Sequence, residues 1–267
     1  MQARAKKGQW LLRIDDLDIA RNVKGANDLI FKTLDSFGLH WDGRVSYQSE
    51  HHDLYAAALT ALDRQNLLYP CFCSRKTLSN LAGNSLENSV YPGFCRNKNS
   101  SNNKPHALRI KTHDAELFFD DNLQLRVKHN LAARHGDFIV KRKDAIIAYQ
   151  LAVVVDDHTQ QITEVVRGAD LLASTIKQIY LQQQLGYTSP EYMHVPVIID
   201  QQGCKLSKQT FAQAVDLQAP QKVLFTLLTM LKQKPPGVLK MASVQQQLSW
   251  AVANWNPEPL KKIVQIV

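Results

Sequence analysis

A short polar loop in the last quarter of the chain carries residues whose types suggest phosphate chemistry. Residues 205–209 read KLSKQ and follow the apolar run 195–199. Lys205 and Lys208 therefore bracket Ser207 just beyond an expected strand. Two flexible ammonium groups in that position can stabilise the negative charge that develops on a phosphate during its transfer. The same five residues would also suit a solvated surface loop, so the rest of the chain must decide between the two.

Three of the four cysteines lie close together in the sequence and suggest a metal site. Cys71 and Cys73 are separated by one residue, and Cys95 follows. Thiolates are soft ligands that select Zn²⁺ in a tetrahedral site, which needs a fourth ligand. The nearest candidates for that ligand are Tyr91, His106 and His113. The residue types alone favour a histidine, and the alternative is that the three cysteines are buried side chains without a metal.

Charged residues at the ends of two expected strands could bind a small substrate. Asp15, in the acidic cluster 15–18, follows an expected strand, at the place where open α/β sheets bind their ligands. A carboxylate there could hold an ammonium group or a ribose hydroxyl. Arg167 ends a second expected strand and could clamp a carboxylate bidentately, with Tyr149 closing the same pocket. Each of these residues could instead be structural, and residues 156–158 are expected to be structural or to contact a ribose.

The order of the expected elements argues for an α/β fold with a parallel sheet. A strand at 10–14 is followed by amphipathic helices at 27–37 and 51–65, and strands and helices alternate again after residue 138. We expect a first helix at 1–7, with Gly8 closing it in a left-handed conformation. Further helices are expected at 150–155, 171–185, 221–231 and 244–254. Further strands are expected at 107–111, 117–127, 162–167 and 195–199.

The expected elements divide the chain into three parts. Residues 1–70 and 138–205 would form the α/β core. Residues 71–137 lack long apolar periods and contain a polar run at 97–104, which indicates a small inserted module around the cysteines. Residues 206–267 hold most of the lysine loop and a helical tail.

Composition argues against a membrane-spanning protein and favours a polyanionic partner. Of the 267 residues, 45% are apolar and 21% are charged, which is typical of a soluble globular chain. The longest nearly apolar run, residues 145–155, is too short to cross a bilayer, and the first residues form no secretory signal. The formal net charge of +8 suits an RNA or DNA partner. With only four cysteines, we expect a cytoplasmic protein with reduced thiols. We also expect a monomer.

Four motifs occur in an order that is typical of one enzyme family. They are residues 10–18 (WLLRIDDLD), 149–158, 163–172 and the KLSKQ loop. Together they resemble the class I glutamyl-type aminoacyl-tRNA synthetases, in which the loop corresponds to the KMSKS element. More narrowly, VRGADL at 166–171, KLSKQ, and the CxC pair followed by YPGFC resemble the glutamyl-Q tRNA(Asp) synthetases, a shortened branch of that family. The 58 residues after KLSKQ are too few for the anticodon-binding region of a full glutamyl-tRNA synthetase.

The resemblance implies a Rossmann-like nucleotide-binding core with a zinc-containing insert and a short helical tail. It implies that ATP and Mg²⁺ activate glutamate to glutamyl-adenylate, and that glutamate then passes to the queuosine base in the anticodon of tRNA(Asp). The implied glutamate-binding residues are Asp15, Tyr149 and Arg167. The implied catalytic residues are Lys205, Ser207 and Lys208, and Lys208 is also the implied ATP contact. The implied ligands of a structural Zn²⁺ are Cys71, Cys73, Tyr91 and Cys95.

Two departures from the family pattern carry expectations of their own. Asp15 stands where the family usually has Glu, which draws the carboxylate back by about 1.5 Å. The family's first strand and HIGH-type element, a helix N-terminus that holds the ATP phosphates, would precede Met1, so we expect the chain from Met1 alone to activate glutamate poorly. Two alternatives remain open: a fragment of a glutamyl- or glutaminyl-tRNA synthetase that charges the tRNA 3′ end, and a non-catalytic RNA-binding paralogue.

Overall fold

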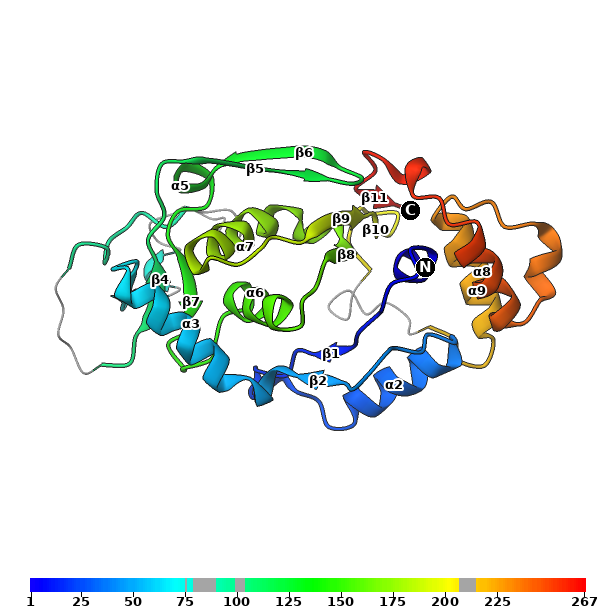
Figure 1. The fold of residues 1–267 in the computed structure, drawn as a ribbon, viewed down its shortest axis with the longest axis horizontal. Coiled ribbons are helices and arrows are strands. Elements are labelled where there is room, and N and C mark those ends of the chain that lie inside the picture. The colour runs from blue at the N-terminus through cyan, green and yellow to red at the C-terminus, as the bar shows by residue number, and fades with distance from the viewer. Residues whose placement is uncertain (75, 79–89, 99–103, 207–214) are drawn as a thin grey trace.

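The computed structural model of the chain, drawn in Figure 1, describes residues 1–74, 76–78, 90–98, 104–206 and 215–267. Two of the expected catalytic residues, Ser207 and Lys208, lie outside these ranges. Within them, helices combine with strands that form four sheets, which confirms the α/β class. None of the described helices is long and apolar enough to cross a membrane.

Three helices pack together near the centre of the molecule and supply much of its main hydrophobic core. They are α3 (His52–Arg64), α6 (Tyr149–Thr159) and α7 (Leu172–Leu185), and Figure 1 shows α6 and α7 side by side. All residues of α6 from 151 to 156 are buried. A helix that is buried around most of its circumference must be covered on several sides. α6 is therefore a central element on which site residues can be held rigidly.

The largest sheet has the strand order β6-β5-β9-β8. Its strands are β5 (Glu116–Asp121), β6 (Leu125–Asn130), β8 (Glu164–Gly168) and β9 (Glu191–Val195). β8 and β9 are parallel and are connected by α7, whereas β5 and β6 form an antiparallel hairpin. The prediction of one strand at 117–127 is wrong, because the Asp121 carboxylate accepts bonds from the next backbone N–H groups and turns the chain. The sequence pattern predicts a parallel sheet, whereas this sheet contains both parallel and antiparallel pairs.

A second sheet carries the start of the cysteine-rich segment. It is antiparallel, with β4 (Ala107–Ile110) between β3 (Leu68–Cys71) and β7 (Phe138–Lys141). Strand pairing also links the expected module to the expected core, because β5 pairs with β9 at Asp121 and Tyr192. The division of the chain into core, module and tail stays a prediction.

The remaining elements lie around these two sheets. β1 (Arg13–Ile14) pairs in parallel with β2 (Ser46–Tyr47), and β10 (Val197–Ile198) pairs in parallel with β11 (Gln265–Ile266), a strand that the sequence pattern did not predict. Further α-helices are α1 (Gln2–Ala5), α2 (Ala26–Ser36), α5 (Leu131–Arg134), α8 (Pro220–Met230) and α9 (Val244–Ala253). Short 3₁₀ helices occupy Ile19–Arg21, Gln48–Glu50, Ala169–Leu171, Gly237–Met241 and Glu258–Leu260.

The first helix connects the main sheet to the C-terminal part of the chain. The Gln2 side chain donates to Glu164 on β8 at 2.7 Å and accepts from the indole N–H of Trp255 at 2.5 Å. Figure 1 shows α1 between β8 and the helices α8 and α9. The left-handed residue after this helix is Lys7 (φ 56°) and not Gly8, which the sequence predicts. The Gly8 N–H bonds back to the carbonyl of residue 3, so Gly8 is the residue after the left-handed one in this helix cap.

Candidate active site and metal centre

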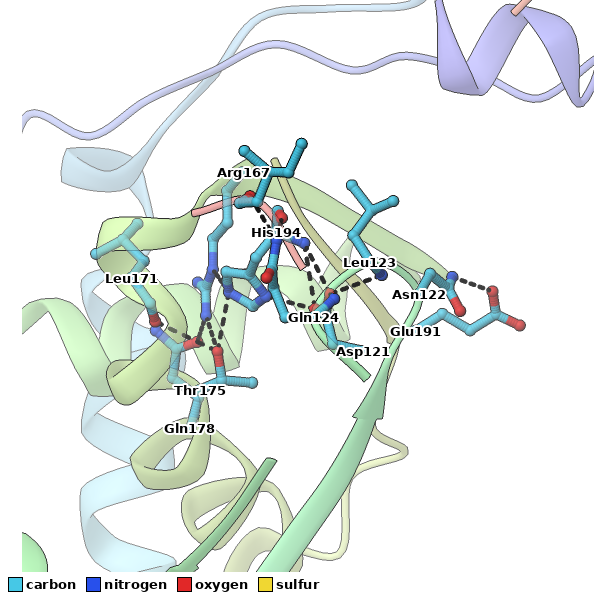
Figure 2. A network of polar contacts seen from close by, with 11 residues as sticks. Asp121, Asn122, Leu123, Gln124, Arg167, Leu171, Thr175, Gln178, Glu191 and His194 are labelled. Atoms are coloured by element: carbon cyan, nitrogen blue, oxygen red, sulfur yellow. Dashed lines mark hydrogen bonds and ion pairs between the residues drawn. The ribbon is translucent and has the colours of Figure 1, made fainter. Parts of the chain in front are cut away.

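Arg167 lies near the carboxyl end of β8, where three side chains hold its guanidinium (Figure 2). Its Nε donates to Nε2 of His194 at 3.1 Å. Its Nη2 donates to Oγ1 of Thr175 at 2.8 Å and to Oε1 of Gln178 at 2.7 Å. The guanidinium has five N–H groups, so only the two on Nη1 lack a partner among the described residues. The edge formed by Nε and Nη2 is therefore engaged by the protein, and a substrate carboxylate would meet Nη1.

A buried acid–histidine pair lies behind Arg167. His194 on β9 is 0% exposed, and its Nδ1 lies 2.6 Å from Oδ2 of Asp121 at the end of β5. The same carboxylate accepts backbone N–H bonds from Leu123 at 2.9 Å and Gln124 at 2.8 Å. Burial opposes ionisation of Asp121, but the bond from His194 and the backbone bonds hold its pKa below the usual value. An ionised carboxylate thus ends a chain of polar contacts that leads through His194 to Arg167, as Figure 2 shows.

Tyr149 is the first residue of α6 and is 40% exposed. The next residue, Gln150, accepts a bond from Gln178 at 3.0 Å, and Gln178 is one of the partners of Arg167. Burial is the main cause that raises the pKa of Tyr192 to about 12, and both Arg167 and Tyr149 are close enough to influence that value. The structure therefore brings the start of α6 and the end of β8 into one area.

Asp15 directly follows β1 and is already paired. Its Oδ1 accepts from Nε of Arg13 at 3.0 Å, and its side chain is 44% exposed. Nη1 of Arg13 also donates to Asp157 on α6 at 2.7 Å. Burial raises the pKa of Asp157, and the positive charges of Arg13 and Arg167 oppose that rise. Arg13 thus links Asp15 to Asp157, whose pKa is influenced by the charge of Arg167. A substrate ammonium group at Asp15 would have to compete with Arg13.

The neighbouring carboxylate, Asp156, is enclosed by the protein. It is 0% exposed and accepts bonds from Gln48 at 2.7 Å, from Nδ1 of His51 at 2.7 Å and from the Tyr55 hydroxyl at 2.9 Å. These partners lie on or just before α3, so the contacts join α3 to α6. These contacts make Asp156 a link between the two helices. Nε of Arg13 also lies 3.8 Å from Asp156, and Nη1 of Arg13 bonds to Asp157.

Lys205 brings the lysine loop to the end of β8. Its Nζ lies 2.6 Å from Oδ2 of Asp170, which follows that strand. Gly168 permits this arrangement, because a Cβ there would lie 2.4 Å from the Asp170 carboxylate and 3.0 Å from Val197 on β10. The described end of the loop therefore lies next to the strand that carries Arg167.

The thiols predicted to bind zinc converge in the structure. The Sγ atoms of Cys71, Cys73 and Cys95 all lie within 4.8 Å of one another, with 3.6 Å between Cys73 and Cys95. The Tyr91 hydroxyl lies 3.5 Å from Cys71 and 3.6 Å from Cys73. A tetrahedral zinc ion with Zn–S bonds of about 2.3 Å would separate its sulfurs by about 3.8 Å. Three soft sulfurs and one phenolic oxygen at this spacing fit a zinc ion.

The two histidines considered as a fourth ligand lie elsewhere. The His106 ring packs 5.4 Å from the Phe72 ring, and the His113 ring lies 6.4 Å from the Tyr180 ring, as measured between centroids. Over the described ranges, the group of converging ligand atoms contains three thiols and no histidine. Tyr91 is therefore the oxygen donor beside the thiols, the position that the family resemblance implied for it. Metal binding by these four residues stays a prediction.

A buried carboxylate ties the segments around the thiols together. Asp137 is 3% exposed and accepts from the Tyr69 hydroxyl at 2.7 Å, from Arg96 at 2.7 Å and from the Thr112 backbone N–H at 2.7 Å. Tyr69 lies on β3 with Cys71, and Arg96 directly follows Cys95. One carboxylate thus fixes the segments that carry the first and last thiol.

Arg109 and Gly136 position Tyr91. Arg109 donates to the Asp137 carbonyl at 2.7 Å and to Sγ of Cys71 at 3.3 Å, and its guanidinium carbon lies 3.7 Å from the centre of the Tyr91 ring. Gly136 has φ +59°, and a Cβ there would lie 3.1 Å from the Tyr91 backbone, so only glycine allows this approach. The fourth donor is therefore held by packing and charge from β4 and from the segment before β7.

Two of the thiols, Cys73 and Cys95, have different electrostatic environments. Burial raises the pKa of Cys73 to about 11. Burial acts in the same direction on Cys95, but hydrogen bonds from the Phe72 backbone N–H, from Tyr91 and from the neighbouring thiols outweigh it and lower the pKa of Cys95 to about 7. A thiolate is the form that binds metal, so Cys95 is better prepared to be a ligand than Cys73.

Sequence reasoning missed the residues that support both sites. Around the guanidinium these are Asp121, Thr175, Gln178 and His194, and around the thiols they are Arg109 and Asp137. One signal was available, because a polar side chain in an otherwise apolar strand must find a buried partner. His194 lies in such a strand, between Met193 and Val195.

Comparison with known proteins points to one family. The family model of tRNA synthetases class I (E and Q), catalytic domain, matches residues 1–233. A protein of Pseudomonas aeruginosa named glutamyl-Q tRNA(Asp) synthetase is 43% identical over 256 residues, which cover 96% of this chain and 85% of that protein. A protein of Serratia proteamaculans with the same name is 42% identical over 262 residues, which cover 98% of this chain and 84% of that protein.

Solved structures share the fold at lower identity. The glutamate–tRNA synthetase of Elizabethkingia anophelis gives a TM-score of 0.77 at 21% identity, over 98% of this chain and 61% of that one. A glutamate–tRNA ligase of Elizabethkingia meningosepticum, crystallised with its amino acid, gives 0.76 at 21% identity over the same shares. The chain thus spans less than two thirds of these structures, which at this identity show the fold alone. Because the family match covers most of its length, the chain belongs to the class I tRNA synthetases of the glutamate and glutamine type and is an enzyme of the ligase class.

Proposed function

We propose that this chain activates glutamate with ATP and transfers it to the queuosine base in the anticodon of tRNA(Asp). Family membership supports the first step, in which glutamate and ATP give glutamyl-adenylate and pyrophosphate. The name shared by relatives at 42% and 43% identity supports the second step, in which a hydroxyl of the queuosine base takes the glutamyl group and AMP leaves. Mg²⁺ would accompany ATP and neutralise part of its phosphate charge.

The observation that carries the proposal is that Arg167 and Lys205, at the described end of the lysine loop, lie at one end of the main sheet. Arg167 offers the two N–H groups of Nη1, and Lys205 is held at the end of the same strand by Asp170 at 2.6 Å. Ligands of open α/β sheets bind beyond the carboxyl ends of the strands. An amino-acid carboxylate and a nucleotide phosphate would therefore be bound close to each other.

The residues at this end of the sheet suit the adenylation step. An oxygen of the glutamate α-carboxylate attacks the α-phosphorus of ATP, and the bond from that phosphorus to pyrophosphate breaks. Lys205 and Lys208 would neutralise the charge that builds up on the phosphate oxygens. Arg167 would hold one carboxylate of glutamate, Asp15 would face its ammonium group, and Tyr149 would cover the pocket.

Cys71, Cys73, Tyr91 and Cys95 would hold one structural zinc ion. Its contribution would be to cross-link the end of β3 to the segment that carries Tyr91 and Cys95. Structural zinc sites with four protein ligands contribute folding free energy and leave no open position for catalysis. We therefore give the metal no part in the reaction.

The test is a transfer assay with two forms of the same tRNA. Radiolabelled glutamate and ATP are supplied with tRNA(Asp) that contains queuosine, or with an unmodified transcript of the same sequence. Both RNAs have the same 3′ end, so charging there would label both. We expect label only on the queuosine-containing tRNA, and ATP–pyrophosphate exchange that depends on glutamate.

The other possible results either favour one of the alternatives or contradict one step of the proposal. Equal labelling of both RNAs would favour an enzyme that charges the tRNA 3′ end. Binding of tRNA without pyrophosphate exchange and without labelling would favour a non-catalytic RNA-binding protein. Exchange with glutamate and no transfer to either RNA would leave the first step in place and contradict the proposed acceptor.

A further inference from the structure

The contacts of His194 fix the position of its ring proton. Asp121 can only accept hydrogen bonds when ionised, so Nδ1 of His194, 2.6 Å away, carries a proton and donates it. Nε of Arg167 always carries a proton and points at Nε2 of His194 at 3.1 Å. Nε2 must therefore be the unprotonated nitrogen that accepts this bond, and the Thr175 hydroxyl, also 3.1 Å away, can donate to it as well. The ring is neutral, with its proton on Nδ1.

The surroundings of the ring favour this state. His194 is 0% exposed, and the guanidinium of Arg167 is a fixed positive charge beside it. A second proton on Nε2 would place two N–H groups head to head and two positive charges in contact. The charged or titratable groups around the pair are Asp121 on β5, Asp157 on α6 and Tyr192 on β9, and α7 contributes the neutral side chains Thr175 and Gln178.

Arg167 depends on this acceptor for its orientation. Thr175 and Gln178 hold Nη2 from one side, at 2.8 Å and 2.7 Å. These two bonds set the plane of the group but hold it at one nitrogen, so it can still turn within that plane as the hydrogen-bond angles change. The third bond, from Nε to His194, holds a second nitrogen and so fixes the direction in which Nη1 faces. A carboxylate bound at Nη1 would lose its geometry if the group tilted.

We propose that His194, kept in its Nδ1-protonated form by Asp121, is a positioning residue that fixes Arg167 for the substrate carboxylate. This inference rests on the proposed function, in which Arg167 binds glutamate. His194 does not touch the substrate. It acts as a neutral acceptor whose tautomer is set by a buried carboxylate, in the way that an acid orients a histidine in hydrolase triads.

Two neutral substitutions of His194 separate the two ring nitrogens. The side-chain amide of His194→Gln reaches the position of Nε2 and can still accept from Arg167. The shorter amide of His194→Asn reaches only the position of Nδ1, so it can contact Asp121 but not Arg167. We expect His194→Asn to weaken glutamate binding about 10- to 100-fold, because one hydrogen bond from a charged group is lost. We expect His194→Gln to stay within about threefold of the wild type.

The measurements are the KM for glutamate and the KM for ATP in pyrophosphate exchange, glutamate affinity by calorimetry, and thermal unfolding. A purely structural role would lower the stability of both variants and change the KM for ATP as well. The nitrogen chemical shifts of the ring, assigned with the His194→Gln variant, report the tautomer directly. We expect a protonated Nδ1 and a bare Nε2.

The outcomes distinguish the positioning role from the proposed function. If Arg167→Ala abolishes glutamate binding and His194→Asn behaves like His194→Gln, the positioning role is overturned and the proposed pocket stands. If neither Arg167→Ala nor His194→Asn affects glutamate, the pocket itself fails. A proton on Nε2 also overturns the inference. If His194→Asn does not fold, Asp121→Asn replaces it, because its amide can donate to Nδ1, drive the proton to Nε2 and raise the KM for glutamate.

Discussion

The thiol cluster and the Arg167 site are built in opposite ways. The four donors of the cluster lie between residues 71 and 95, and their side chains would themselves bind the ion. Arg167 is one side chain of its site, and its orientation comes from residues 175, 178 and 194, with residue 121 behind them. The first site is local in sequence, and the second is assembled from β5, β8, α7 and β9.

The two sites are therefore sensitive to different kinds of substitution. A cluster of ligands depends on the presence of each donor, because a tetrahedral ion needs all four. A positioned guanidinium depends on the groups behind it, because its charge persists even when its direction is lost. We therefore expect ligand substitutions to affect folding at the first site, and supporting substitutions to affect substrate affinity at the second.

The largest expected effect is the loss of the metal. Cys95→Ser should remove about one zinc ion per chain and lower the melting temperature by about 5–10 °C, because structural zinc contributes folding free energy. Elemental analysis and thermal unfolding measure both. Cys204→Ser is the matched control, since that thiol is exposed and lies outside the cluster. Stoichiometric zinc in a Cys71→Ser, Cys73→Ser double variant would show that the ligands are wrongly assigned.

The next effect concerns substrate binding at Arg167. Arg167→Ala should lower kcat/KM for glutamate by about 100- to 1000-fold, as expected for the loss of a charged contact. Arg167→Lys keeps the charge but lacks the planar group that bonds to His194, so most of the loss should remain. Pyrophosphate exchange measures both variants. Arg126→Ala, which breaks an exposed pair with Asp120, is the control, and an equal loss in it would refute a specific role.

A smaller effect should separate the support of the thiols from the thiols themselves. Asp137→Asn keeps the shape of the side chain but removes the charge that binds Arg96, so it should cost about 1–3 kcal/mol of unfolding free energy. Urea unfolding provides the measurement. Asp120→Asn, which removes the same charge from the protein surface, should leave stability nearly unchanged. Equal stability of the two variants would mean that the buried carboxylate does not support the cluster.

The smallest effect is on the acid dependence of stability. The folded-state pKa of Asp121 is below its unfolded value of about 3.9. Its ionisation therefore stabilises the fold fully above that value, and this contribution is lost as the pH falls through the lowered pKa. Urea unfolding at a series of pH values measures the difference in unfolding free energy between the wild type and Asp121→Asn. The difference in free energy should be constant from pH 7 to about 5 and shrink below about pH 4. A difference that shrinks between pH 7 and 5 would contradict a lowered pKa of Asp121 in the folded protein.

The sequence predicted the elements best where the pattern is local. The helices expected at 27–37 and 51–65 appear as α2 and α3, and the strand expected at 162–167 appears as β8. The pattern predicts one strand where β5 and β6 form a hairpin, because the turn depends on a side chain, Asp121, that bonds to the backbone beyond it. β11 was not predicted at all, since two residues carry no periodic signal and their pairing partner is β10.

For the sites, residue types and motifs are enough to identify the candidate functional residues. The types and spacing of the thiols and lysines, the arginine at a strand end, and their order along the chain were enough to indicate the family that the comparisons show. These features are chemical and local, so they can be read without a fold.

The way in which those residues are held depends on contacts that form when the chain folds. It placed Tyr91 and not a histidine beside the thiols, paired Asp15 with Arg13, and left Nη1 as the free side of Arg167. It also revealed His194 and Asp121, which are brought together by the pairing of β5 with β9. Contacts between residues far apart in sequence depend on how strands and helices pack. That packing is a property of the whole chain and not of any segment within it.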